Sequence, residues 1–314
     1  MIISDRNRST SVIFILFGFS DYPEFHILLF LLFLAIYVIT VMGNLGMIAI
    51  IIMNPKLHTP MYFFLKHLSI VDFCYSTAVT PKLLENLVPE DKTMSIPTCI
   101  MQFFFIANCA LTDTVMLGVM AYDRFVAICN PLLYMAVMSQ KRWSLFIAAG
   151  YSWGILLSLL FTYSLLVLSF CRPKIIDNFV CEYSGILSAS CSDKYFSQLI
   201  LRIVANFNML STLMIIFTSY IFISVTVMKM NSAGARHMPF STCDSHLTAV
   251  GIFYGTILFL YCIPNSKSSC FTIKVGSVFY TVVIPMLNPL IHSLKNKDVK
   301  ETLRKLMDKK MMSH

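Results

Sequence analysis

Two acidic side chains, Asp72 and Asp113, stand inside long apolar stretches of this 314-residue chain. Charged groups are costly in hydrocarbon, so an acid in such a place usually marks an ion, proton or substrate site. Two carboxylates that share a dry site cannot both stay ionised cheaply, and they would hold a proton or a cation between them. The sequence equally allows separate sites, with each acid satisfied by Asn44, Ser69, Asn288 or water.

A second charged pair, Asp123 and Arg124, lies in the string MAYDRFVAIC at 120–129. Taken alone, such a pair at a membrane boundary is most simply an interfacial anchor. The histidines His58, His67 and His246 are also expected at the membrane margin. The chain has no His-Glu-x-x-His or Gly-x-Ser-x-Gly string, which argues against a metalloprotease or a serine hydrolase. We therefore expect no enzyme and no cofactor.

Seven apolar stretches must position these groups. The composition is 57% hydrophobic, and the mean hydropathy of +0.73 lies far outside the range of soluble domains. A membrane-spanning helix needs about 20 mostly apolar residues. Stretches of sufficient length lie at 26–53, 60–88, 97–129, 143–169, 197–228, 239–262 and 270–293. The sequence predicts an all-α membrane protein, a seven-helix bundle with an extracellular segment at 1–25, a transmembrane domain at 26–293 and a cytoplasmic tail at 294–314. The tail is expected to form an amphipathic helix on anionic lipid.

The distribution of cations orients this bundle with its N-terminus outside. Of the 24 lysines and arginines, 14 fall on the proposed inner side, which carries a net charge of about +9 against about +1 outside. Cytoplasmic loops are enriched in such residues. In this orientation Asp72 and Asp113 each lie about 16 residues below the outer surface, or roughly 24 Å at 1.5 Å per residue. Their similar depth makes a shared site plausible.

Cysteines and a sequon support the same orientation. Cys99, Cys171, Cys181 and Cys191 all fall on the proposed outer face, where disulfides persist. The sequence alone leaves three pairings open. Asn7 begins an Asn-Arg-Ser sequon, which is glycosylated only in the lumen. The apolar run at 12–19 lacks a small-x-small cleavage site, so we expect the first span to act as an uncleaved signal.

The outer halves of several spans carry a mainly apolar set of side chains with a few hydrogen-bonding groups, the usual character of a small-molecule site. Any single member is also expected as a packing residue. In span six, Gly251 and Gly255 are candidate hinges, with close helix packing as the rival explanation. No acid lies in the outer half of any span, so we expect small, neutral, largely apolar ligands. The candidate ligand-binding residues are Phe104, Phe105, Asn108, Thr112, Val204, Phe207, Asn208, Tyr254, Ile257, Leu258, Tyr261, Val278 and Thr281.

Several strings, each at its expected span and in order, resemble one family. They are Gly43-Asn44, LHTPMYFFL at 57–65, LSIVD at 68–72, MAYDRFVAIC at 120–129, Ser219-Tyr220, FSTCDSH at 240–246 and PMLNPLI at 285–291. Together they resemble the olfactory receptors, a family of rhodopsin-like G-protein-coupled receptors, over nearly the whole chain.

The resemblance implies a multi-pass receptor of the plasma membrane that binds a small volatile odorant. It also implies a stimulatory, olfactory-type G protein as the partner, a rise in cyclic AMP as the output, and trafficking chaperones as further partners, with no nucleic acid. A Cys99–Cys181 bond and a Cys171–Cys191 bond are implied as well. A membrane transporter or channel that uses the Asp72/Asp113 pair is the alternative function, although such folds commonly show internal repeats that this sequence lacks.

The resemblance also assigns roles at the inner face. It implies that Asp123 holds Arg124 in the resting state, and that Arg124 then helps admit the C-terminal helix of the G-protein α subunit. The residues implied in coupling or activation are Asp123, Arg124, Tyr220, Asn288, Pro289 and His292.

Three departures from the family pattern bear on coupling. The family usually has Tyr where this chain has His292 and where it has Phe125, and a Lys-Ala pair where it has Met238-Pro239. His292 is shorter than Tyr and can be charged. Met238 removes a cation from the G-protein face, and Pro239 constrains the start of span six. We therefore expect basal activity and coupling strength to differ from the family norm.

Overall fold

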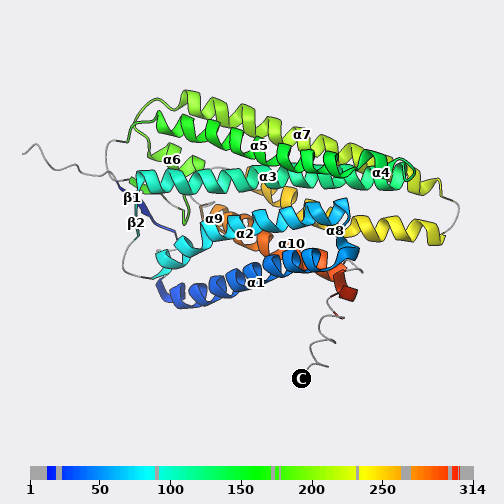
Figure 1. Ribbon diagram of the computed structural model, residues 1–314. Coiled ribbons are helices and arrows are strands. Elements are labelled where there is room, and N and C mark those ends of the chain that lie inside the picture. Colours follow the sequence, from blue (N-terminus) through cyan, green and yellow to red (C-terminus); the bar gives the residue numbers. More distant parts are fainter. Residues whose placement is uncertain are drawn as a thin grey trace, which may run out of the picture.

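The computed structural model describes residues 13–18, 23–88, 92–170, 174–176, 178–230, 233–262, 270–295, 299–302 and 304. The long helices lie side by side along one axis (Figure 1), with the short helix α6 and the strands at one end and α4 at the other. The sequon at Asn7 and most of the predicted tail helix fall outside the described residues. The long helices are α1 (His26–Met53), α2 (Pro60–Leu87), α3 (Ile96–Cys129), α5 (Gln140–Leu166), α7 (Tyr195–Met228) and α8 (Ala233–Cys262).

A last membrane crossing is built from three consecutive pieces. These are α9 (Cys270–Val278), a π-helical turn at Phe279–Val283 and α10 (Ile284–Lys295). Within the described residues, six segments are long and apolar enough to cross a membrane by composition alone. The helix α2 is equally long but carries Lys66, Asp72, Lys82 and Glu85, and it packs between α1 and α3. With α2, the predicted seven-helix membrane bundle is confirmed.

Local signals explain where the helices begin. At the start of α3, the side chain of Ser95 accepts a hydrogen bond from the backbone N–H of Thr98, and Pro97 occupies the first turn. Pro60 likewise occupies the first turn of α2, without a side-chain cap from Thr59. The predicted ends of the spans agree with the helices to within six residues, and the largest difference is at α8, which begins at Ala233 instead of residue 239.

The first and last crossings are joined by close packing and a buried amide. A Cβ atom placed on Gly43 would lie 3.1 Å from Cγ of Pro289, so glycine allows the two helices to approach. The side chain of Asn44 donates to the carbonyl of Pro285 at 3.0 Å. By contrast, no described atom lies within 4 Å of a Cβ placed on Gly251 or Gly255. Close packing therefore does not explain these two glycines, and the hinge stays a prediction.

A small sheet, which the sequence did not predict, covers the outer end of the all-α bundle. The strands β1 (Ile13–Leu16), β2 (Thr93–Ser95) and β3 (Lys174–Ile176) pair in the order β2-β1-β3. β1 runs antiparallel to β2 and parallel to β3. Phe14 and Leu16 are fully buried beside the disulfide. The apolar run that sequence reasoning compared with a signal peptide is thus a structural strand.

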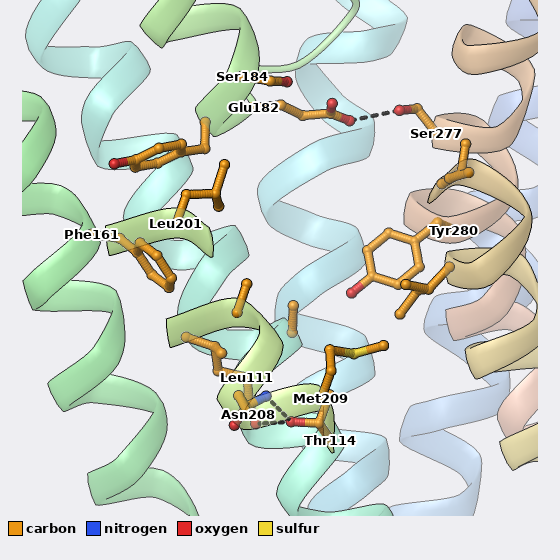
Figure 2. A pocket seen from close by; sticks show the side chains of 15 residues that line it. Leu111, Thr114, Phe161, Glu182, Ser184, Leu201, Asn208, Met209, Ser277 and Tyr280 are labelled. Atoms are coloured by element: carbon orange, nitrogen blue, oxygen red, sulfur yellow. Dashed lines mark hydrogen bonds between the residues drawn. The ribbon is translucent and has the colours of Figure 1, made fainter. Parts of the chain in front are cut away.

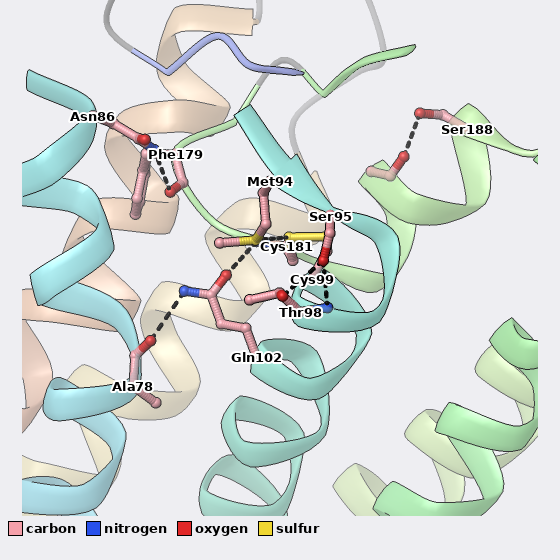
Figure 3. Close-up of a disulfide and its surroundings, with 11 residues drawn as sticks. Ala78, Asn86, Met94, Ser95, Thr98, Cys99, Gln102, Phe179, Cys181 and Ser188 are labelled. Atoms are coloured by element: carbon pink, nitrogen blue, oxygen red, sulfur yellow. Dashed lines mark hydrogen bonds between the residues drawn. A yellow bond between two sulfur atoms is a disulfide. The ribbon is translucent and has the colours of Figure 1, made fainter. Parts of the chain in front are cut away.

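The Cys99–Cys181 disulfide holds the loop before α6 to the first turn of α3, far away in the sequence (Figure 3). Gln102 supports it, because its amide oxygen accepts from the backbone N–H of Cys181 while its amide nitrogen donates to the carbonyl of Ala78. This pairing, which the resemblance implied, is confirmed. Cys191 is disulfide-bonded, but Cys171 lies outside the described residues, so the second pairing stays a prediction. Cys74, Cys109, Cys129 and Cys243 are free thiols.

Candidate functional site: an outer cavity with a polar group at each end

A cavity of about 380 Å³ lies below the disulfide, among α3, α5, α6 (Tyr183–Ala189), α7, α8 and the last crossing (Figure 2). Most of its wall is apolar. It is lined by Ala110, Leu111, Thr114, Phe161, Glu182, Tyr183, Ser184, Leu201, Ala205, Asn208, Met209, Ile257, Leu260, Ser277 and Tyr280. Its size and lining suit a small organic molecule rather than a peptide.

The outer end of the cavity carries a carboxyl group, Glu182. It follows Cys181 directly, so the disulfide fixes it over the bundle. Its Oε1 accepts a hydrogen bond from the Ser277 hydroxyl at 2.7 Å. Burial raises the pKa of Glu182, although hydrogen bonds from Ser277 and Asn178 act in the opposite direction. Sequence reasoning considered only acids within the spans, whereas a loop supplies an acid to this cavity.

The inner end of the cavity carries a chain of polar side chains across three helices. Nδ2 of Asn208 donates to the hydroxyl of Thr114 at 2.9 Å, and Oδ1 of Asn208 accepts from the indole N–H of Trp153 at 3.0 Å. Figure 2 shows Asn208 and Thr114 together at the end opposite Glu182. A ligand in this cavity thus meets an acid at one end and an amide–hydroxyl pair at the other, with apolar walls between.

The structure brings only part of the predicted ligand set to this cavity. Asn208 and Ile257 line it. Phe105, Phe207 and Leu258 have exposed side chains, 50%, 59% and 53% accessible, and are directed at the surroundings of the bundle. The side chain of Tyr261 is not among those described.

The remaining predicted residues pack around the cavity. Thr112 is buried, and it lies with the half-buried Asn108 against Gly154 of α5. Tyr254 is buried and bonds to the hydroxyl of Thr212. Thr281 donates to the carbonyl of Ser277. Val204 and Val278 pack against buried clusters beside the cavity. Phe104 packs edge to face against the exposed ring of Phe105.

Sequence reasoning missed the residues of the second outer loop and the inward face of α5. Glu182, Tyr183 and Ser184 reach the cavity only because the loop folds over the bundle. One signal was present in the sequence: Glu182 adjoins the cysteine that the resemblance tied to the top of span three. Helical spacing could not reveal Phe161, since a helix that crosses a membrane has no hydropathy contrast between its two faces.

The two intramembrane acids do not behave alike. Asp72 is buried and accepts two hydrogen bonds from Nδ2 of Asn288, at 3.2 and 3.0 Å. Asp113 is also buried, and its Oδ1 has no hydrogen-bond partner among the described residues. It lies close enough to Asp72 for two charged carboxylates to repel each other. The sequence also allowed each acid to be hydrogen-bonded separately, for example to Asn288. The structure shows a bond to Asn288 for Asp72 alone.

The inner end of the bundle brings four of the six predicted coupling residues together, namely Asp123, Arg124, Tyr220 and His292. Asp123 accepts a hydrogen bond from the hydroxyl of Tyr134 in the short helix α4 (Tyr134–Val137), and it lies within electrostatic range of Arg124. The Arg124 guanidinium donates to the carbonyl of Met120. His292 is buried within electrostatic range of Arg124. Pro289 packs against Gly43 instead, one turn further from the inner surface than His292.

A second contact at this end was not expected. The hydroxyl of Tyr220 and Nδ1 of His246 are 2.7 Å apart, and Nε2 of His246 lies 3.1 Å from the carbonyl of Leu117. His246 is fully buried, so its expected interfacial position is wrong. This imidazole joins α3, α7 and α8. Two of the positions at which this chain departs from the family pattern can also be placed. Phe125 packs against Phe222 of α7. Residues 238 and 239 lie within α8, but their side chains are not described.

Comparison with known proteins agrees with this architecture. The family model described as "Olfactory receptor" matches residues 33–310. Olfactory receptor 5D18 and Olfactory receptor 5D13 of Homo sapiens are each 58% identical over 314 residues, which covers all of this chain and all of each relative. Olfactory receptor 1165 of Mus musculus is 56% identical over all of this chain and 99% of its own.

Among solved structures, the crystal structure of squid rhodopsin superposes with a TM-score of 0.74 over 91% of this chain and 86% of that chain. At 14% sequence identity this likeness shows the fold alone. The family match assigns the chain to non-enzymatic signalling receptors rather than to transporters or channels. The family match and the high sequence identity to these relatives over the whole chain, together with the rhodopsin-like bundle, show that this protein belongs to the olfactory receptor family.

Proposed function

We propose that this receptor binds a small volatile odorant in the cavity between Glu182 and Asn208, at the plasma membrane. The observation that supports this proposal is an apolar cavity of about 380 Å³ with a polar group at each end. Glu182 narrows the expected ligand class from neutral, largely apolar molecules in general to those that also donate a hydrogen bond, such as alcohols or phenols. An ionised or hydrogen-bonded carboxyl favours such donors.

The receptor responds by a shift of population. An odorant favours the active arrangement only by binding it better than the resting one. Burial of around ten heavy atoms provides modest affinity, on the order of micromolar. Opening of the inner end near Arg124 would then admit the G-protein α subunit. The stimulatory subunit, a rise in cyclic AMP and dependence on trafficking chaperones belong to the same proposal.

The pair Asp72 and Asp113 is proposed as an ion or proton site within the receptor. Asp113 presents a carboxylate oxygen without a partner among the described residues, and Asp72 lies nearby. A cation or a proton between them would relieve the repulsion between two buried carboxylates.

A cyclic-AMP reporter screen against a panel of volatiles tests the function. Arg124→Ala is the signalling control and should abolish responses at matched surface expression. Ala205→Phe fills the cavity, and Ile203→Phe is its matched control, because Ile203 is an exposed residue of the same helix. The expected result is loss of the response with Ala205→Phe and its retention with Ile203→Phe. A wild-type response from Ala205→Phe would place the ligand elsewhere.

A further inference from the structure

A second and larger hollow, of about 560 Å³, lies on the flank of the bundle between α3, α5 and α7. Three aromatic side chains, Tyr122, Phe146 and Trp153, form much of its wall. Gly118 and Ala149 contribute little volume, and this is why a hollow remains between three packed helices. It is separate from the odorant cavity, with which it shares a single lining residue, Asn208.

This flank groove opens toward hydrocarbon. Its rim includes Ile215, 47% exposed, and Ala149 is exposed as well. In α7, Asn208 lies 13 residues after Tyr195 and Ile215 lies 13 residues before Met228. Each is therefore about 20 Å from the nearer end of the helix at 1.5 Å per residue. A phospholipid headgroup does not reach this depth, so an occupant must be an uncharged molecule dissolved in the apolar core.

The polar side chains that α7 contributes to the groove are already bonded within the protein. Both ends of the Asn208 amide are bonded, to Trp153 and to Thr114. The hydroxyl of Ser211 donates to the carbonyl of Asn208, and the hydroxyl of Thr212 is 2.7 Å from that of Tyr254. The groove thus offers aromatic and aliphatic contact rather than free hydrogen bonds. Such a wall selects apolar, preferably aromatic, molecules.

We propose that the flank groove is a second binding site, for an uncharged apolar molecule of odorant size that enters from the bilayer, and that Asn208 and Thr212 transmit its occupancy. An occupant packed against Trp153 acts on the Asn208 amide, which is also part of the odorant cavity wall. Through Thr212 it acts on Tyr254 in α8. The two sites are therefore coupled through a chain of direct contacts, and occupancy of one changes the affinity of the other.

Photolabelling tests the site without any signalling. The full-length receptor in phospholipid nanodiscs is irradiated with 3-trifluoromethyl-3-phenyldiazirine, with and without excess trifluoromethylbenzene, and labelled peptides are mapped. The expected result is labelling of the α5 segment with Phe146 and Trp153 that the competitor reduces at least fivefold. Ala149→Phe should remove this competed labelling, and Ala148→Phe should keep it, because residue 148 is also exposed but does not line the groove.

A further variant separates this proposal from the proposed odorant site. Ala205→Phe fills the odorant cavity and should leave the groove labelling unchanged. Labelling that the competitor does not reduce, or that is equal at all membrane-facing residues, would show that only lipid chains fill the groove and would overturn the proposal.

Coupling is measured with an odorant that activates the receptor in the reporter screen. A fixed concentration of trifluoromethylbenzene should shift the half-maximal odorant concentration about fivefold or more in the wild type. The shift should disappear in Ala149→Phe and in Tyr254→Phe, which removes the hydroxyl contact with Thr212. Groove labelling should be retained in Tyr254→Phe, because Tyr254 does not line the groove. A shift that persists in both variants would indicate competition in the odorant cavity, and no shift in the wild type would overturn the coupling.

Discussion

The amide nitrogen of Asn288 donates to both carboxylate oxygens of Asp72, at 3.2 and 3.0 Å. This contact joins α10 to α2 in the middle of the bundle. It leaves Asp113, on α3, as the acid whose Oδ1 lacks a described partner. The two acids are thus unequal, and this inequality predicts different results when each is neutralised.

We expect Asp113→Asn to remove the sodium or pH dependence of signalling, because the proposed site then holds a single carboxylate. Asp72→Asn should alter the same dependence and also weaken the contact with Asn288, at a cost of about 1–3 kcal/mol. Cyclic-AMP responses across a series of sodium concentrations and pH values measure both effects. An unchanged dependence in both variants would show that the acids form no ion or proton site.

Glu182 predicts a dependence of odorant potency on external pH. Burial raises the pKa of its carboxyl above the ordinary value of about 4.5. The carboxylate therefore forms only as the pH rises through this elevated value, and the neutral acid predominates below it. Potency of an alcohol or phenol that donates to Glu182 should increase with rising pH, and Glu182→Gln should flatten the profile. The same pH profile in Glu182→Gln would exclude this carboxyl as the group that titrates.

His292→Tyr should shift basal signalling. His292 is buried near Arg124 and His246, and its Nε2 has no hydrogen-bond partner among the described residues. A tyrosine there is longer and carries a hydroxyl group, so it must displace its neighbours or bond to one of them. Basal cyclic AMP at matched surface expression is the measurement, and identical values for the two proteins would contradict the prediction.

His246→Ala should raise basal signalling, because it removes the link that joins α8 to Tyr220 of α7 and to the carbonyl of Leu117 in α3. The neighbouring variant Leu247→Ala is the control, since that side chain is 43% exposed. The expected cost in folding stability is about 1–3 kcal/mol, from the buried groups left without partners. A basal level that stays at the control value would mean that this link does not restrain α8.

Cys99→Ser should reduce surface expression. The Cys99–Cys181 disulfide closes a loop across a sequence separation of 82 residues and fixes Glu182 over the cavity. Loss of such a bond costs roughly 2–5 kcal/mol. Cys74→Ser, which changes an exposed free thiol, is the matched control. Flow cytometry of an N-terminal epitope measures both variants, and equal expression would show that the sheet and the packing suffice.

Hydropathy predicted the bundle well because a membrane-spanning helix satisfies its own backbone hydrogen bonds, so that length and apolarity suffice to identify it. The helix α2 shows where this signal weakens. Its four charged residues lower its hydropathy, and its packing between α1 and α3 completes the set. The strand at Ile13–Leu16 could not be predicted, because its partners, Thr93–Ser95 and Lys174–Ile176, lie far away in the sequence.

The sequence by itself determined the seven crossings, their orientation and the family, since each depends on composition or on strings of adjacent residues. It also identified Asp72, Asp113 and Asn208 as polar groups of interest. Only the tertiary structure decided that Glu182 faces the ligand cavity, that Asn208 separates two hollows and that His246 joins three helices. These facts depend on how the helices are rotated and on where a disulfide holds a loop. Hydropathy does not determine either one, because lipid and the bundle interior are similarly apolar.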